Sequence, residues 1–385
     1  MSKSIHTSEL AGAAERYQDT FGLLCNLIRT SSFSREETAT AGIIADFLRS
    51  KNITTHRFLN NVWAVNAHFD PAKPSILLNS HHDTVHPNKG YTKDPFSAEE
   101  KDGKLYGLGS NDAGGALTGL IQAFCFYHPQ KNLPYNLVIA ATAEEEISGR
   151  NGVEALLQHD AFIQSTHHAF GNEGRNGSFG IVGEPTLLNM AVAERGLLVL
   201  DCTAQGKAGH AAREEGDNAI YRAMTDIDWF RRFQFEKISP LLGPVKMTVT
   251  IIQAGEQHNV VPHECRFTVD VRVNELYTFE EVLQRIRSNV SCFVEPRSIR
   301  LRPTSISVDH PIVQAGLRLK RSHYGSPTTS DKALMTFPAL KIGPGDSARS
   351  HTADEYIYTD ELRGGTEFYI QLLQELFGSR ITKPI

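Results

Sequence analysis

Acidic and imidazole side chains gather in five short motifs that follow apolar runs or glycine-rich turns. These are Ser80-His-His-Asp83, Asp112 after the turn Gly107-Leu-Gly-Ser110, Glu144-Glu-Glu146, Glu184-Pro185 and His351 in a late glycine-rich loop. Carboxylates held together repel one another and bind protons unless a cation lies between them. Imidazole combined with carboxylates suits Zn²⁺, and two adjacent ions can share one carboxylate. The five motifs together predict a metal site.

The elements that must position these motifs alternate between strand and helix up to about residue 185. Apolar runs predict strands at Val62–Ala67, Ile76–Asn79 and Leu137–Ala141, and the segment Asp112–His128 has the pattern of a helix. This alternation predicts an α/β fold with a largely parallel sheet. Ligands of such sheets bind at the carboxyl ends of the strands, so three motifs are expected to face one crevice within reach of Asp112.

The pattern changes after Pro185 to an order of strand, helix, strand, strand, helix and strand. The segments are Leu188–Ala204, Asp217–Phe233, Val245–Ile252, Cys265–Val273, Thr278–Val290 and Ile299–Ile306. This order is typical of a ferredoxin-like α+β unit. The first pattern then resumes and ends in a helix at Thr359–Phe377. We therefore expect one α/β domain, residues 1–187 and 303–385, interrupted by an inserted α+β domain, residues 188–302.

Composition excludes several classes of protein. The 385 residues include 39 Lys+Arg and 44 Asp+Glu, a net charge of −5, which argues against a nucleic-acid partner. Five scattered cysteines without a C-x-x-C pair indicate free thiols in a reducing compartment. No apolar run approaches the ~20 residues that span a bilayer, and no secretion signal is apparent. We expect a cytoplasmic protein with no membrane partner.

The motifs, in their order and spacing, resemble the zinc aminoacylase/carboxypeptidase family. The matching segments are Ser80-His-His-Asp83, Tyr106-Gly-Leu-Gly-Ser-Asn-Asp112, Ala143-Glu-Glu-Glu146, Val182-Gly-Glu-Pro-Thr186 and the His351 loop. That family includes acetylornithine deacetylase and succinyl-diaminopimelate desuccinylase. The resemblance implies a di-zinc exopeptidase-like catalytic domain, and it implies that the ferredoxin-like insert is a lid and dimerisation domain of a homodimer.

The resemblance also implies roles for the residues at the strand ends. Two divalent ions, Zn²⁺ or alternatively Co²⁺ or Mn²⁺, would be held by His81 and Glu184 on one side, by Glu146 and His351 on the other, and by Asp112 between them. Asp83 would orient the imidazole of His81. Glu145 would act as the general base. His82 is the alternative ligand to His81, but the family motif places the ligand two residues before Asp83.

In the insert, the resemblance points to an oxyanion-binding histidine and to residues that hold a substrate carboxylate. His210, in Gly206-Lys-Ala-Gly-His210, would reach into the partner subunit's active site, and a turn histidine without a role is the alternative. Asn259 and Arg272 would bind the substrate carboxylate, and Arg195 is a weaker candidate. A surface ion pair is the alternative for Arg272. The loop Thr329-Ser-Asp331 resembles a family loop near the substrate.

These features predict metal-dependent hydrolysis of the amide bond of an N-acyl-L-amino acid. The branch of the family that the late loops resemble most suggests N-acetyl-L-ornithine, N-succinyl-ornithine or N-acetyl-citrulline as substrate, in arginine biosynthesis. Lys332 and Arg349 are candidate cations for a succinyl carboxylate. A dipeptidase or carboxypeptidase with the same site is one alternative. A non-catalytic scaffold is another, but the complete set of ligands and the base argue against it.

Overall fold

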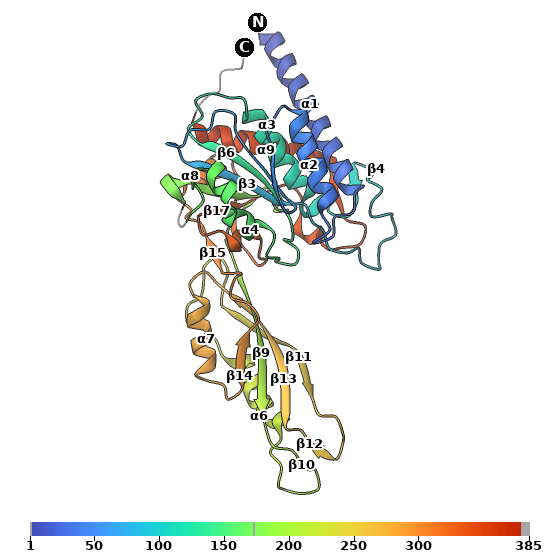
Figure 1. The fold of residues 1–385 in the computed structure, drawn as a ribbon, viewed down its shortest axis with the longest axis vertical. Helices are drawn as coiled ribbons and strands as arrows, with labels where there is room; N and C mark the ends of the chain where they lie inside the picture. Colours follow the sequence, from blue (N-terminus) through green and yellow to red (C-terminus); the bar gives the residue numbers. More distant parts are fainter. Residues whose placement is uncertain (1, 172–173, 379–385) are drawn as a thin grey trace. The chain divides into compact units, whose positions relative to one another are not determined.

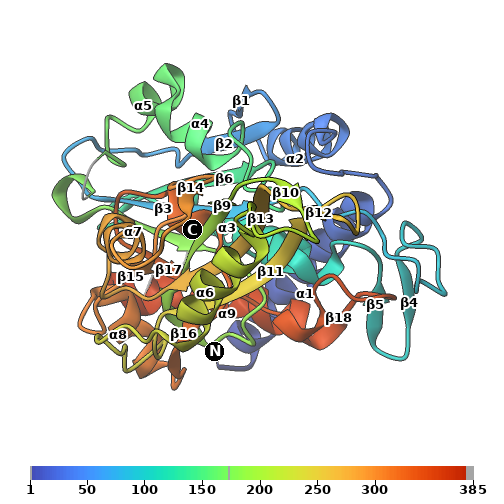
Figure 2. The ribbon, with the colours of Figure 1, turned by 90° about the horizontal axis from the view of Figure 1, so that it is seen from below.

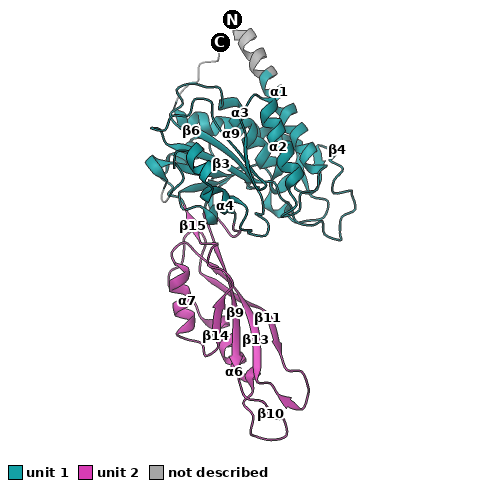
Figure 3. Ribbon diagram, in the orientation of Figure 1, with its two compact units in different colours: residues 1–192, 306–324, 330–385 teal, residues 193–305, 325–329 magenta. Residues whose placement is uncertain are grey.

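A computed structural model describes residues 2–171 and 174–378, with side chains from residue 12 onward. The chain divides into two compact units (Figure 3). Unit 1 comprises Met1–Val192, Ile306–Tyr324 and Ser330–Ile385, and unit 2 comprises Ala193–Ser305 and Gly325–Thr329. The sequence pattern did not indicate this second, short passage through unit 2.

Unit 1 is built on a mixed sheet whose strand order is β1-β2-β6-β3-β7-β17-β8. Strands β15 and β16 pair with β8; β15 and the ends of β8 and β16 belong to unit 2. The strands are β1 (His56–Phe58), β2 (Asn61–Val65), β3 (Ser75–His81), β6 (Asn136–Thr142), β7 (Phe179–Val182), β8 (Met190–Glu194), β15 (Thr304–Ser305), β16 (His323–Ser326) and β17 (Ala339–Lys341). Strand β3 runs parallel to both β6 and β7. Every residue of β3 and β6 is buried, as expected for parallel strands covered on both faces.

Helices cover both faces of this sheet. They are α1 (Ser2–Ile28), α2 (Thr38–Ser50), α3 (Gly115–Tyr127), α4 (Val153–Gln158), α5 (Asp160–Ser165), α8 (Pro311–Arg318) and α9 (Thr359–Phe377). Helix α3 packs on β3 and β6 and is itself covered by α1 and α9. Its side chains are buried almost all round, which explains its apolar and small residues. Helices α4 and α5 lie on the opposite face of the sheet (Figure 2). There, Val153, Leu156 and Phe162 join a core with Trp63 and Val138 of the sheet.

A separate three-stranded sheet includes the strand before the turn of Asp112 and the strand after the loop of His351. Its order is β18-β5-β4, with β4 (Glu99–Lys101), β5 (Lys104–Tyr106) and β18 (Tyr356–Tyr358). Strand β5 leads into the turn that contains Asp112, and β18 follows the loop of His351. The antiparallel pairing of Tyr106 with Tyr356 therefore brings these two distant segments side by side.

Unit 2 contains the predicted strand–helix order. Its elements are β9 (Gly196–Gln205), α6 (Ala219–Arg232), β11 (Lys246–Ala254), β13 (Glu264–Val273), α7 (Phe279–Arg287) and β14 (Phe293–Pro296). The sheet order β11-β13-β9-β14 is antiparallel throughout and is that of a ferredoxin-like unit. Residues of β9 are buried alternately, because one face packs against α6 and α7. Two strand predictions were wrong: the last strand is β14 instead of Ile299–Ile306, and the run from Leu188 is split into β8 and β9 at Arg195.

Two short strands, β10 (Gly209–His210) and β12 (Val260–Val261), form a ribbon of their own in unit 2 (Figure 1).

Within residues 2–171 and 174–378, no helix is both long enough and apolar enough to span a membrane.

Candidate metal centre

Three neighbouring strands of unit 1 end at the same edge of the sheet. His81 is the last residue of β3 and pairs with Thr142, the last residue of β6, while Asn79 pairs with Val182 at the end of β7. The motifs that follow β6 and β7 therefore start beside His81. His81 and the loops of Glu146 and Glu184 therefore lie at one edge of the sheet.

Two groups of side chains meet at this edge, and Asp112 belongs to both. In the first group, His81 Nε2 lies 3.4 Å from Asp112 Oδ1 and 3.9 Å from Glu184 Oε1. In the second, His351 Nε2 lies 2.8 Å from Glu146 Oε2 and 3.7 Å from Asp112 Oδ2. The two carboxylate oxygens of Asp112 thus face different groups, as a carboxylate bridging two ions must.

The first group fits a cation, because the buried Nε2 of His81 has no hydrogen-bond partner. The other ring nitrogen, Nδ1, lies 3.0 Å from the carbonyl oxygen of Asp83, to which it donates its proton. The lone pair of Nε2 is thereby directed at two carboxylates. Burial opposes a charge on this ring, but the carboxylates of Asp112 and Asp83 raise the pKa of His81 well above its usual value. One imidazole and two carboxylates are a ligand set that suits a divalent ion such as Zn²⁺.

Asp83 is a buried carboxylate that holds the loop after β6. Its Oδ2 accepts hydrogen bonds from Ser34 Oγ at 2.7 Å and from the backbone N–H of Glu146 at 3.1 Å. Its Oδ1 accepts the backbone N–H of Glu145 at 3.0 Å and lies 3.4 Å from His81 Nδ1. Burial opposes ionisation, but His81 and these donors hold the pKa of Asp83 below its usual value. Asp83 therefore fixes the predicted base and two predicted ligands together.

Glu145 is half-buried beside this centre. Burial raises its pKa well above the usual value; the charge of His81 lowers it, and the carboxylates of Glu184, Asp331 and Glu146 raise it further. A carboxylate with a raised proton affinity, next to a ligand but not itself in either group, is suited to take up and return a proton.

His82 does not take part in either group. Its Nδ1 lies 2.9 Å from Thr40 Oγ1, and its Nε2 lies 2.9 Å from the carbonyl oxygen of Asn60. Burial lowers its pKa to about 4, so the ring is neutral. Both nitrogens are thus used by the protein, which supports His81 over His82 as the ligand.

Three residues of the late loops have structural partners that the sequence did not indicate. Asp331 is buried and accepts hydrogen bonds from Asn79 Nδ2 at 3.0 Å and Thr142 Oγ1 at 2.8 Å, so it supports the ends of β3 and β6. Lys332 is buried, with Nζ 3.5 Å from the carbonyl oxygen of Ala191. Arg349 pairs with Glu361 at 2.8 Å. The ammonium group of Lys332 and the guanidinium group of Arg349 thus both have partners within the protein.

Glu355, which was not predicted from the sequence, accepts backbone hydrogen bonds from the Asp112 turn with its carboxylate. Its position four residues after His351 was visible, but its partners lie more than 240 residues away in the chain. No local pattern could have identified it.

In unit 2, His210 and Asn259 share the β10–β12 ribbon. The backbone N–H of Ala211 donates to the carbonyl oxygen of Asn259 at 2.9 Å. Nδ1 of His210 accepts the backbone N–H of Ala212 at 3.1 Å, which requires the neutral ring to carry its proton on Nε2. The exposed Nε2–H is therefore available as a hydrogen-bond donor.

The two predicted arginines of unit 2 are engaged within the protein. Arg272 forms a two-pronged pair with Asp270, with N–O distances of 2.8 and 3.0 Å. Arg195 donates to the carbonyl oxygens of Leu242, Pro244 (2.8 Å) and Arg272 (3.3 Å), and burial lowers its pKa.

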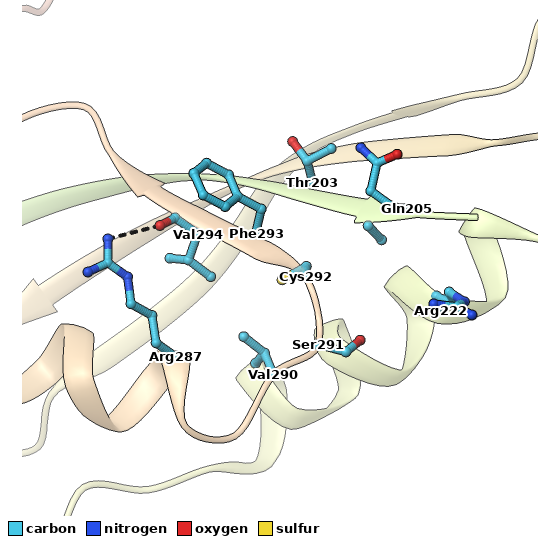
Figure 4. Close-up of a pocket in the computed structure, with 10 residues that line it drawn as sticks. Thr203, Gln205, Arg222, Arg287, Val290, Ser291, Cys292, Phe293 and Val294 are labelled. Atoms are coloured by element: carbon cyan, nitrogen blue, oxygen red, sulfur yellow. Dashed lines mark hydrogen bonds between the residues drawn. The ribbon is translucent and has the colours of Figure 1, made fainter. Parts of the chain in front are cut away.

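A cavity of about 550 Å³ also lies in unit 2, but it contains none of the predicted site residues (Figure 4). It is bordered by β9, β14 and the segment after α7. Both of its arginines are used internally: Arg287 donates to the carbonyl oxygen of Val294 at 3.0 Å, and Arg222 pairs with Asp217. We assign no ligand to it.

An α/β sheet that carries two His/carboxylate groups sharing Asp112 is the arrangement expected of a metal-dependent hydrolase. The sequence profile of Peptidase family M20/M25/M40 matches residues 77–375. The chain belongs to this family, which confirms the family predicted from the motifs.

Curated relatives cover most of the chain at low identity. Succinyl-diaminopimelate desuccinylase 2 of Ruegeria sp. is 24% identical over 402 residues, covering 96% of this chain and 98% of the relative. Acetylornithine deacetylase of Myxococcus xanthus is 26% identical over 338 residues, covering 78% of this chain and 80% of the relative.

Solved structures confirm the fold class, including the small antiparallel sheet. Aminopeptidase PepT of Bacillus cereus has a TM-score of 0.71 at 16% identity, covering 94% of this chain and 98% of that one. The YXEP protein of Bacillus subtilis, described as a dinuclear metal-binding peptidase of the M20 family, has a TM-score of 0.70 at 15% identity, covering 95% and 99%.

Proposed function

We propose that this protein hydrolyses the amide bond of an N-acyl-L-amino acid with two divalent ions, Zn²⁺ in the first instance and Co²⁺ or Mn²⁺ as alternatives. The observation that carries the proposal is Asp112, whose two carboxylate oxygens face two different His/carboxylate groups. His81 and Glu184 would hold one ion, Glu146 and His351 the other, and Asp112 both. Bound there, the ions would supply Lewis-acid activation of a water molecule and of the amide carbonyl.

Glu145 would carry the proton in this reaction. Its carboxylate takes a proton from the attacking water and returns it to the amine nitrogen as the C–N bond breaks. The raised pKa of Glu145 in the metal-free protein reflects a carboxylate that accepts a proton readily. Asp83 would keep Glu145 in place through the backbone N–H that it binds.

His210 would stabilise the negative oxygen of the tetrahedral intermediate. Its Nε2–H is available because Nδ1 accepts a backbone hydrogen bond. We propose that it does so in the active site of the partner subunit of a homodimer. Exposed apolar side chains of unit 2 support a dimer interface there: β11 is an edge strand with exposed Ile251 and Ile252, and α6 exposes Tyr221 and Met224.

Mixing two inactive variants tests this arrangement. A heterodimer of Glu145→Gln and His210→Ala would contain one site with both native residues, provided that His210 acts on the partner. Activity that reappears on mixing is the expected result. Two variants that stay inactive when mixed, although shown to exchange subunits, would place His210 outside the partner's site.

Asn259 and Arg272 would hold the carboxylate of the substrate. Asn259 shares the ribbon of His210. Asp270 would keep the guanidinium of Arg272 in one orientation. For Arg195, the three backbone carbonyls that it binds support a role in holding the strand of Arg272 more than direct substrate contact.

N-acetyl-L-ornithine is the substrate that we propose first, with N-succinyl-ornithine and N-acetyl-citrulline next, in arginine biosynthesis. Support comes from the relatives named acetylornithine deacetylase and succinyl-diaminopimelate desuccinylase. We also propose a cytoplasmic location, because all five cysteines are free thiols.

A panel of substrates tests the proposal. Free-amine release would be measured for the zinc-loaded protein with these three substrates, succinyl-diaminopimelate and several dipeptides, each with a chelator control. Chelator-sensitive release from an N-acyl amino acid is the expected result. Release from dipeptides alone would assign the site to peptide hydrolysis, and no release by protein with bound metal would refute hydrolysis.

A further inference from the structure

The turn that presents Asp112 is held by one distant carboxylate. Oε1 of Glu355 accepts the backbone N–H groups of Asn111 and Asp112, both at 2.9 Å, and Oε2 accepts that of Gly109 at 3.1 Å. The carbonyl oxygen of Glu355 accepts a fourth hydrogen bond, from the backbone N–H of Gly107 at 2.9 Å. Glu355 thus satisfies four backbone donors of residues 107–112.

Glu355 also fixes a second segment of the metal centre, because it lies between the loop of His351 and strand β18. Its neighbour Tyr356 pairs with Tyr106 of β5, so the backbone on the C-terminal side of Glu355 is anchored. The Glu355 side chain is buried. Asp112 and His351 supply two of the three residues of the second group, and Glu355 joins the segments that carry them.

The turn keeps other hydrogen bonds without this carboxylate. The backbone N–H of Gly114 donates to the carbonyl oxygen of Gly109 at 2.9 Å, and Asn111 Nδ2 donates to that of Asp346 at 3.1 Å. A variant of Glu355 is therefore expected to fold. What changes is the placement of Asp112, whose own backbone N–H is one of the donors.

We propose that Glu355 is a positioning residue that sets the distance between Asp112 and His351, and with it the affinity for the second metal ion. The inference rests on the metal centre proposed above. Glu355 contacts neither ion in this scheme, so it acts through the two ligands that it holds.

Glu355→Gln is the test variant. An amide in this place keeps one acceptor oxygen and turns an NH₂ group toward at least one backbone N–H of the turn, which loses its acceptor. Zinc titration by calorimetry and metal analysis after dialysis would give the affinity of each ion. We expect the second ion to bind about 10–100-fold more weakly and the first to change much less, as is usual when a group supporting a ligand is altered. Activity at limiting zinc should fall, and saturating zinc should restore it.

Asp226→Asn is the matched control in unit 2. Asp226 is a buried carboxylate that also accepts backbone N–H groups, those of Ser291 and Cys292, at 2.9 Å each. The Asp226→Asn substitution should lower the midpoint of urea unfolding and leave the affinity for both zinc ions unchanged. Glu355→Asp, which keeps the carboxyl group on a shorter side chain, should weaken binding of the second ion in the same way and serves as the second variant if Glu355→Gln does not fold.

Two outcomes would overturn the inference: Glu355 variants that bind both ions with wild-type affinity, or equal losses of affinity in the Glu355 and Asp226 variants. Wild-type protein that binds fewer than two ions would instead refute the metal centre itself, so the two failures are distinguishable.

Discussion

Asp83 offers the sharpest test of how the centre is held together. Its carboxylate accepts hydrogen bonds from Ser34, Glu145 and Glu146 and faces the imidazole of His81. Replacing it by asparagine keeps the shape, but one carboxylate oxygen becomes an NH₂ group. If the remaining oxygen takes the place of Oδ2, Ser34 and Glu146 keep their acceptor, while the backbone N–H of Glu145 faces another donor. His81 Nδ1–H keeps the carbonyl oxygen of residue 83 as its acceptor, but the NH₂ group replaces the carboxylate oxygen beside it.

The expected cost follows from these contacts. Losing one charge-assisted hydrogen bond costs about 1.5–3 kcal/mol, and two more weaken to the neutral kind, so the free energy of unfolding should fall by about 3–5 kcal/mol. The base, one ligand loop and the imidazole then lose their common support. We expect kcat/KM to fall about 10–100-fold at saturating zinc.

Urea unfolding of the metal-free protein would measure the first effect, and amide hydrolysis the second. Ser34→Ala is the matched control, because it removes one donor to Asp83 and leaves both loop amides in place. Ser34→Ala should cost about 1.5–3 kcal/mol, and kcat/KM should stay within about threefold of wild type. The reasoning would be refuted if Asp83→Asn retained wild-type kcat/KM, or if both variants lost activity equally.

Two further predictions concern the base and the second group. Glu145→Gln should lower kcat by about 10²–10⁴-fold while zinc affinity stays at the wild-type value, since Glu145 is not a ligand; a parallel loss of zinc in titrations would contradict its role as base. Hydrogen bonding to Glu146 raises the pKa of His351 to about 9 in the metal-free protein. Zinc must displace that proton, so affinity for the second ion should rise by up to about tenfold per pH unit from pH ~7 to ~9. Affinity measured by calorimetry that does not change with pH would exclude His351 as a ligand.

The sequence predicted those features that depend on local periodicity. Buried parallel strands such as β3 and β6 are continuous apolar runs, so their carboxyl ends, and the polar residues that follow them, could be located. The helix–strand order of the insert was visible for the same reason. The strand predicted at Ile299–Ile306 was wrong: β14 is only Phe293–Pro296, and one of its four residues is buried. An exposed edge strand leaves little hydrophobic pattern to detect.

Contacts between distant segments could not be predicted. His81 and His82 differ only in what surrounds them, and the partners of His82, Thr40 and Asn60, are set by tertiary packing. Glu355 has an acidic side chain in a loop, as have many surface residues, and its role depends on a turn about 245 residues earlier. Sequence spacing identifies candidate ligands, whereas the groups that hold them emerge from the three-dimensional structure.

The central claim is that Asp112 joins two metal ions, and anomalous diffraction from zinc-soaked crystals tests it most directly. The account predicts two peaks about 3.5–4 Å apart, one beside His81 and Glu184 and the other beside Glu146 and His351, each within bonding distance of a different oxygen of Asp112. A single peak that does not involve Asp112, or zinc bound only elsewhere on the protein, would contradict it.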